Sequence, residues 1–115
     1  MQSSAQVVII GGGSLGVSLL YHLAEEGWND VILIEKGELT SGSTWHAAGL
    51  CSNFIGNMTV AKIHNYSIRL YDEILPSQSG NPSVFHKCGS LRVGYSRVEE
   101  EWFNHLLSRS KNVPC

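Results

Sequence analysis

Residues 6–16 read QVVIIGGGSLG, a run of β-branched residues that ends in a cluster of glycines. The run from 6 to 10 has no polar break after its first residue, which is typical of a strand buried on both faces of a parallel sheet. Gly11, Gly13 and Gly16 then fit the pattern GxGxxG. The first glycine permits a tight turn, the second lets a pyrophosphate approach the backbone, and the third lets a following helix pack on the strand.

The segments that follow complete one βαβ unit. From 14 to 26 the apolar residues recur at helical spacing, and Gly27 stands where a C-terminal cap is expected. Residues 31–34, VILI, predict a second buried strand that ends on Glu35. A unit of about 30 residues with a right-handed crossover is the expected result.

This unit predicts a dinucleotide site, although an ordinary glycine-rich turn is the alternative. The amides of Gly13, Ser14 and Leu15, at the start of the helix, would face a pyrophosphate. Glu35 lies about 20 residues beyond the glycines, where a carboxylate accepts hydrogen bonds from the adenosine ribose. A 2′-phosphate there would meet like charge, which argues against NADP. FAD and NAD both remain open at this point.

The rest of the chain predicts a loop and further helices. Residues 37–56 are rich in small polar residues yet carry an apolar patch, so we interpret them as a working loop. A helix is expected from an N-cap at Asn57 to a stop at Pro76. Two short strands at 84–86 and 90–95 would turn at Cys88 and Gly89, and a last helix would surround residues 102–107.

Composition narrows the classes of function. The 115 residues are 43% hydrophobic and 16% charged with a formal charge of −2, and they contain no basic run. Nucleic acid and an anionic membrane surface are therefore not expected as partners. No apolar stretch reaches the ~20 residues of a membrane span, and the first residues lack a charged signal region, so we expect a soluble cytoplasmic protein. The three cysteines are odd in number and form no CxxC pair, so we interpret them as reduced thiols.

Residues 38–50, ELTSGSTWHAAGL, resemble the flavin-proximal segment of the dimethylglycine and sarcosine dehydrogenase family, within the D-amino-acid-oxidase-like flavoproteins. Residues 62–71 and 88–92 resemble the helix and strand that follow in that family. The resemblance implies FAD, joined covalently through its 8α carbon to His46, whose neutral imidazole is a competent nucleophile. The flavin contacts implied by motif and resemblance are Gly11, Gly13, Ser14, Leu15, Gly16, Glu35, Lys36, Gly42, Ser43, Thr44, Trp45, His46, Ala47, Ala48, Gly49 and Leu50.

Two of these residues have plainer alternatives. His46 alone would be interpreted as a loop histidine held by a hydrogen bond. Trp45 alone would be a core anchor, although we expect it to pack on the cofactor. The remaining histidines are expected to be structural or exposed, and neither Arg69 nor Arg92 is assigned to substrate.

The resemblance implies an α/β fold, namely an incomplete Rossmann-like FAD-binding domain. Residues 1–115 would be the amino-terminal part of that domain, inactive by itself and without an assigned catalytic residue. The whole enzyme would transfer a hydride from the N-methyl group of dimethylglycine or sarcosine to the flavin. The product iminium would be hydrolysed to formaldehyde or captured by tetrahydrofolate, and electrons would pass to an electron-transfer flavoprotein or to oxygen.

Two other functions remain open, namely a non-catalytic homologue of the pyruvate dehydrogenase phosphatase regulatory type and a plain NAD-binding module. The resemblance also makes the mitochondrial matrix an alternative compartment if the source is eukaryotic. The sequence departs from the family at 51–54 and 93–95, which bears on the identity of the substrate.

Overall fold

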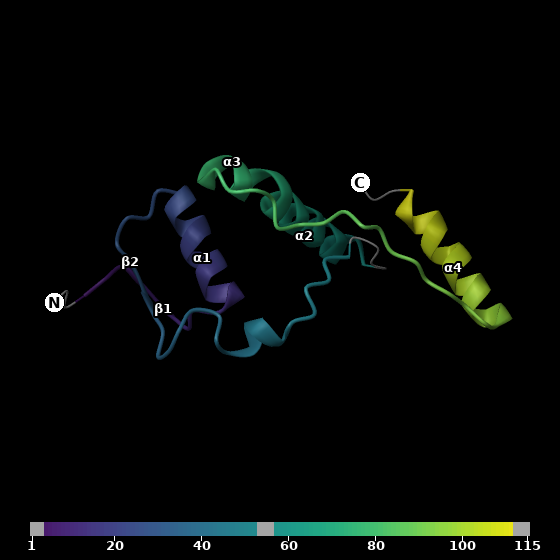
Figure 1. The fold of residues 1–115 in the computed structure, drawn as a ribbon, viewed down its shortest axis with the longest axis horizontal. Helices are drawn as coiled ribbons and strands as arrows, with labels where there is room; N and C mark the ends of the chain where they lie inside the picture. Colours follow the sequence, from purple (N-terminus) through teal and green to yellow (C-terminus); the bar gives the residue numbers. More distant parts are fainter. Residues whose placement is uncertain (1–3, 53–56, 112–115) are drawn as a thin grey trace. The chain divides into compact units, whose positions relative to one another are not determined.

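A computed structural model describes residues 4–52 and 57–111, and the chain divides into two compact units, 1–49 and 50–115 (Figure 1). The first unit contains β1 (Val7–Ile10), α1 (Ser14–Glu25), β2 (Val31–Ile34) and the 3-10 turn η1 (Ser43–His46). The second contains α2 (Met58–Arg69), the π-helical turn η2 (Leu70–Ile74), α3 (Leu75–Ser79) and α4 (Arg97–Ser110).

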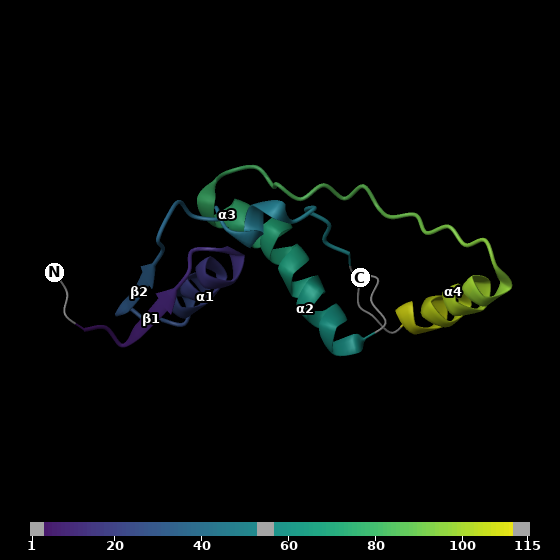
Figure 2. The ribbon, with the colours of Figure 1, turned by 90° about the horizontal axis from the view of Figure 1, so that it is seen from below.

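The first unit is the predicted βαβ unit. Strands β1 and β2 pair in parallel, with Val7 opposite Val31 and Ile10 opposite Ile34. Helix α1 contacts both strands and runs beside the pair in Figure 2. The predicted mixed α/β class is therefore confirmed, and α1 begins at the expected residue.

Helix α1 ends in the expected glycine cap. Gly27 has a φ of 84°, a left-handed conformation that glycine adopts without the steric cost of a side chain. Its amide donates to the Ala24 carbonyl, and the amide of Trp28 donates to the Leu23 carbonyl over 2.9 Å. This pair of bonds is the Schellman motif, and it turns the chain back toward β2.

The prediction that the first strand is buried on both faces is wrong. Ile9 is buried, whereas Val8 and Ile10 are 49% and 86% exposed. Successive side chains of a strand point to opposite faces, so α1 covers the face that carries Ile9 and leaves the other open. A continuous apolar strand is typical of a doubly wound sheet, in which helices cover both faces.

In the second unit, α2 begins at the predicted cap. The Asn57 side chain accepts hydrogen bonds from the amides of Thr59 and Val60, at 2.9 and 3.2 Å. The predicted stop at Pro76 is wrong, because the helical path continues through η2 and α3 to Gly80, which has a φ of 71°. Pro76 lies in the first turn of α3, where a missing amide hydrogen is tolerated.

The predicted strands at 84–86 and 90–95 are also wrong, since residues 80–95 contain no strand. The backbone hydrogen bond found here is local, since the amide of Cys88 donates to the His86 carbonyl over 2.8 Å. A strand needs a paired neighbour that satisfies its backbone hydrogen-bonding groups. The local sequence pattern of residues 84–95 does not determine whether such a neighbour is present. The last helix, α4, is confirmed, and Ser96 and Glu99 form a capping box at its start.

Among the described residues, no helix combines the length and the apolar character that crossing a bilayer requires. Cys51 and Cys88 carry exposed free thiols. Cys115 lies outside the described residues.

Candidate functional site

The glycine turn between β1 and α1 has the geometry that its pattern anticipates. Gly11 has a φ of 109°, and its amide donates to the Ile34 carbonyl over 2.8 Å, which extends the pairing of the two strands. A Cβ atom at Gly16 would collide with the Gly11 carbonyl oxygen. The turn therefore needs glycine at its first position for conformation and at its last for close packing of α1.

Glu35 follows β2 directly, and its carboxylate is bonded to the turn. Its Oε2 accepts a hydrogen bond from the Gly12 amide over 2.6 Å, and its Oε1 accepts one from the Gly37 amide over 3.0 Å. The bond from Gly12, followed by that from Gly37, holds the pKa of the Glu35 carboxyl below its usual value of 4.5. The carboxylate lies at the carboxyl end of the strand pair, where a parallel sheet binds its ligands.

The amino end of α1 is open to solvent, and one of its amides has a side-chain partner. Ser14 and Leu15 are both exposed. The Ser14 amide donates to Oγ1 of Thr44 over 2.9 Å. A Cβ atom at Gly13 would lie 3.0 Å from the same oxygen. The absence of a side chain at Gly13 thus makes room for Thr44 as well as for the backbone approach that the pattern anticipates.

The loop after β2 folds back over the glycine turn. The Thr40 amide donates to the Gly12 carbonyl over 2.9 Å, with Thr40 in the left-handed region at φ 66°. A Cβ atom at Gly12 would lie 2.6 Å from Cδ2 of Leu39. Gly12, which is a variable position in GxGxxG, is therefore confined by the loop.

His46 closes η1 and is bonded within the same turn. Its Nδ1 lies 3.2 Å from the Gly42 carbonyl oxygen. A carbonyl can only accept, so Nδ1 donates, and in the neutral ring Nε2 keeps its lone pair. The Trp45 ring lies 4.0 Å from the His46 ring between centroids, at 37° between planes. Trp45 is 66% exposed, so in this structure it is not a core anchor.

Within the first unit, the structure brings most of the predicted flavin contacts into one region. The glycine turn, Glu35 and η1 are joined by the hydrogen bonds just described. Lys36, Ala47 and Ala48 are exposed, and Gly49 is left-handed at φ 70°. Leu50 begins the second unit and is 87% exposed.

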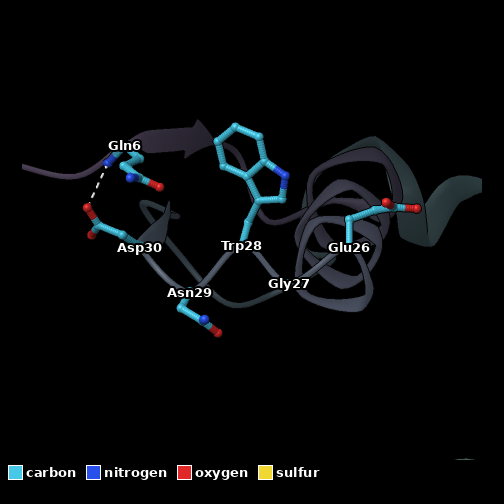
Figure 3. Close-up of a pocket in the computed structure, with 6 residues that line it drawn as sticks. All are labelled: Gln6, Glu26, Gly27, Trp28, Asn29 and Asp30. Carbon is cyan, nitrogen blue, oxygen red and sulfur yellow. Dashed lines mark hydrogen bonds between the residues drawn. The ribbon is translucent and has the colours of Figure 1, made fainter.

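A hollow at the opposite end of the βαβ unit is not part of this site. It is lined by residues just before β1 and by the link from α1 to β2, with Gln6, Trp28 and Asp30 among them (Figure 3). The Gln6 amide donates to the Asp30 carboxylate there over 3.0 Å. This is the amino end of the strands, whereas α/β sheets bind ligands at the carboxyl end.

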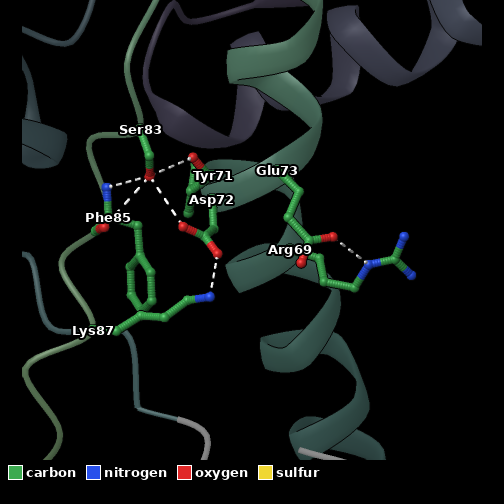
Figure 4. Close-up of polar contacts among 7 residues, drawn as sticks. All are labelled: Arg69, Tyr71, Asp72, Glu73, Ser83, Phe85 and Lys87. Carbon is green, nitrogen blue, oxygen red and sulfur yellow. Dashed lines mark hydrogen bonds and ion pairs between the residues drawn. The ribbon is translucent and has the colours of Figure 1, made fainter.

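A polar cluster in the second unit ties η2 to the extended segment after α3 (Figure 4). Lys87 pairs with Asp72, and Oγ of Ser83 donates to the same carboxylate over 3.3 Å. The bond from Lys87 lowers the pKa of the Asp72 carboxyl, and the carboxylate in turn raises the pKa of the Lys87 ammonium. Arg69 pairs with Glu73 on the same helical path.

Two residues of the first unit, Gly12 and Thr40, were not predicted to take part in the site, and Thr44 was predicted only as a flavin contact. A left-handed Thr40 carries no sequence signal because it is β-branched, and the bond between Thr44 and the Ser14 amide joins positions thirty residues apart. The contact between Leu39 and Gly12 is likewise long-range and has no local pattern.

The geometry of this site is compatible with a bound dinucleotide. The amino end of α1 is exposed, Gly11 has open space where a Cβ would stand, and a carboxylate follows β2. These are the donor set and the clearance that a pyrophosphate and a ribose require.

Comparison with known proteins agrees with this geometry. Residues 6–114 match the family described as FAD dependent oxidoreductase. Human mitochondrial dimethylglycine dehydrogenase is 48% identical over 106 residues, which cover 92% of this chain and 12% of that protein. The mouse mitochondrial pyruvate dehydrogenase phosphatase regulatory subunit is 37% identical over 97 residues, which cover 84% of this chain and 11% of that protein.

A solved structure shares the fold. The glycine oxidase of Bacillus cereus superposes with a TM-score of 0.68 at 25% identity, over 93% of this chain and 30% of that one. The chain thus spans about an eighth of the relatives named above and under a third of the glycine oxidase. The resemblance drawn from the WHAAGL run is confirmed by the match with dimethylglycine dehydrogenase.

Proposed function

The chain belongs to the FAD dependent oxidoreductase family, and from that membership we propose that it forms the adenine-dinucleotide part of the flavin site in an N-methyl amine oxidoreductase. The observation that carries the proposal is the joining of three features at one edge of the βαβ unit. These are the glycine turn, the carboxylate of Glu35 and the exposed amino end of α1.

Each feature has a defined task in holding FAD. The amides at the start of α1 other than that of Ser14, which donates to Thr44, would stabilise the pyrophosphate together with the partial positive charge of the helix terminus. Glu35 would accept hydrogen bonds from the ribose hydroxyls, because the amides of Gly12 and Gly37 hold its carboxylate at the carboxyl end of β2. The bound flavin would supply the acceptor for a hydride from an N-methyl carbon, and the chain would supply position and electrostatics.

We propose His46 as the point of covalent flavin attachment. Donation from its Nδ1 to the Gly42 carbonyl supports this role, because it leaves Nε2 as the nucleophilic atom. His46 is also exposed, as an attacking group must be. Trp45, which lies against the His46 ring, would pack on the isoalloxazine.

The substrate we propose is a small N-methylated amino acid, dimethylglycine before sarcosine. The 48% identity with dimethylglycine dehydrogenase supports this order. Tetrahydrofolate and an electron-transfer flavoprotein are proposed as partners of the whole enzyme, with residues 1–115 as its amino-terminal part. The mitochondrial names of the two relatives favour the matrix over the cytoplasm as the compartment.

The second candidate is a non-catalytic regulatory protein, which the 37% identity with the phosphatase regulatory subunit supports less strongly. One experiment separates the candidates. The full-length protein is purified, precipitated in acid, and, in a second sample, mixed with dimethylglycine without oxygen. An oxidoreductase with covalent FAD keeps its yellow colour in the precipitate and is bleached by substrate. A regulatory protein is not bleached, and an NAD module has no yellow chromophore to lose.

A further inference from the structure

The turn that carries His46 is attached to α1 through one side chain. The hydroxyl of Thr44 accepts the hydrogen bond of the Ser14 amide over 2.9 Å. Thr44 is half-buried, whereas its neighbours in η1 are exposed. The first turn of a helix leaves its amides without partners inside the helix, so this contact satisfies one of them from a distant part of the chain.

The backbone of Thr44 closes the same turn. Its carbonyl accepts the Ala47 amide over 3.2 Å, while the Gly42 carbonyl accepts from the His46 ring. The His46 ring is therefore fixed inside η1 by short-range bonds. Whatever fixes η1 on α1 also fixes the place of His46.

A second anchor lies four residues earlier. The Thr40 amide donates to the Gly12 carbonyl, and Thr40 stands at a φ of 66°. A β-branched residue in the left-handed region is strained and persists only where its surroundings hold it. The loop is thus held on the glycine turn at two points, Thr40 by its backbone and Thr44 by its side chain.

We propose that Thr44 is a positioning residue, whose hydroxyl docks the His46 turn on the amino end of α1. The docking itself does not depend on the proposed function. Its consequence, the placement of His46 for reaction with the flavin, rests on the proposed function. A hydroxyl is the group the contact needs, because valine has the same shape without the acceptor, and serine keeps the acceptor without the methyl.

The test uses the full-length protein as three variants, Thr44→Val, Thr44→Ser and the control Thr59→Val, which changes an exposed threonine on α2. Amide hydrogen exchange at Ser14 is measured without added FAD. We expect exchange about tenfold faster in Thr44→Val, the effect of losing one net hydrogen bond. Thr44→Ser and Thr59→Val should stay within about threefold of the wild type.

A second readout separates placement of His46 from simple cofactor affinity. Apoprotein is mixed with FAD, and the covalently held and releasable fractions are followed over time. At saturating FAD, where affinity no longer limits the rate, Thr44→Val should slow formation of the covalent fraction by about tenfold, and Thr44→Ser should restore the rate.

Unchanged Ser14 exchange in Thr44→Val would overturn the inference, and so would a serine variant that behaves like the valine variant. A wild type that never acquires covalent flavin would count against the role of His46. In that case faster Ser14 exchange in Thr44→Val, with rescue by serine, would still support docking by Thr44. The two failures are therefore distinguishable.

Discussion

Oε2 of Glu35 lies 2.6 Å from the amide nitrogen of Gly12, so the acid that follows β2 is bonded to the middle of the glycine turn. The same carboxylate accepts the Gly37 amide. Glu35 thus holds together the two segments that form the edge of the site. Binding of a ribose would take place on a carboxylate already fixed in position.

This bonding gives the first unit a predictable pH dependence. Because the folded-state pKa of Glu35 is below 4.5, its hydrogen bonds add stability above pH 4.5, and that contribution is lost as the pH falls through the lower folded-state pKa. Urea midpoints measured from about pH 6 to about pH 3 should fall more steeply for the wild type than for Glu35→Gln. The control Glu38→Gln, three residues away and exposed, should follow the wild type. Parallel curves for wild type and Glu35→Gln would contradict the bonding.

Gly12→Ala should destabilise the chain by about 1–3 kcal/mol, as overpacking does. The added Cβ would stand 2.6 Å from Leu39 Cδ2 and 3.1 Å from Glu35 Cβ. The double variant Gly12→Ala with Leu39→Ala should recover part of the loss relative to Leu39→Ala alone, as measured by urea denaturation. Gly37→Ala is the matched control, since its Cβ meets Ser41 Oγ at an ordinary 3.4 Å. An equal loss at Gly37 would contradict the packing argument.

In the second unit, we expect the Ser83 hydroxyl to stabilise the segment around Phe85 more than the ion pair between Lys87 and Asp72 does. The Lys87 side chain is 67% exposed and that of Asp72 is 18% exposed, and solvent at the lysine weakens the pair by screening its charge. Oγ of Ser83, by contrast, contacts the Asp72 carboxylate and accepts the Phe85 amide over 3.1 Å. Ser83→Ala should speed amide exchange at Phe85 by about tenfold and Lys87→Met by less than about threefold. A larger effect of Lys87→Met than of Ser83→Ala would show that the ion pair stabilises the segment instead.

The 115-residue chain expressed alone should self-associate and hold FAD weakly. Ile10, Leu15 and Ile34 are 86%, 87% and 52% exposed. Within residues 4–52 and 57–111 no third strand pairs with the sheet, and its two open edges invite association. Cofactor pockets bury most of their ligand. The βαβ unit would contact FAD from one side only, so it should bind the cofactor weakly. Light scattering after gel filtration checks this prediction. A monodisperse monomer saturated with FAD would refute it.

The βαβ unit could be predicted from sequence because its signals are local. The glycines, the apolar runs and the cap at Gly27 each act within a few residues. The exposure of Val8 and Ile10 could not be predicted, because it depends on what covers the second face of the sheet. Continuation of the helix past Pro76 could not be predicted either, because it depends on how η2 leads into α3. Pro76 lies in the first turn of α3, where proline is tolerated.

The site was predictable in residue type but not in its internal bonds. Glu35 and His46 follow from motif and resemblance, whereas the pairing of Thr44 with Ser14 joins positions far apart in the chain. The left-handed Thr40 opposes the local preference of a β-branched residue. The strands expected near 84 and 91 failed for the related reason that a ladder requires a partner strand.

Covalent attachment at His46 is measured directly by mass spectrometry of the tryptic peptide that lies between Lys36 and Lys62 and contains His46. Full-length protein and its His46→Ala variant are loaded with FAD and digested. We expect the wild-type peptide to carry the mass of FAD on His46. The variant peptide should carry none, while the variant protein still binds FAD reversibly through the glycine turn and Glu35. An unmodified wild-type peptide at full flavin occupancy would contradict covalent attachment at His46.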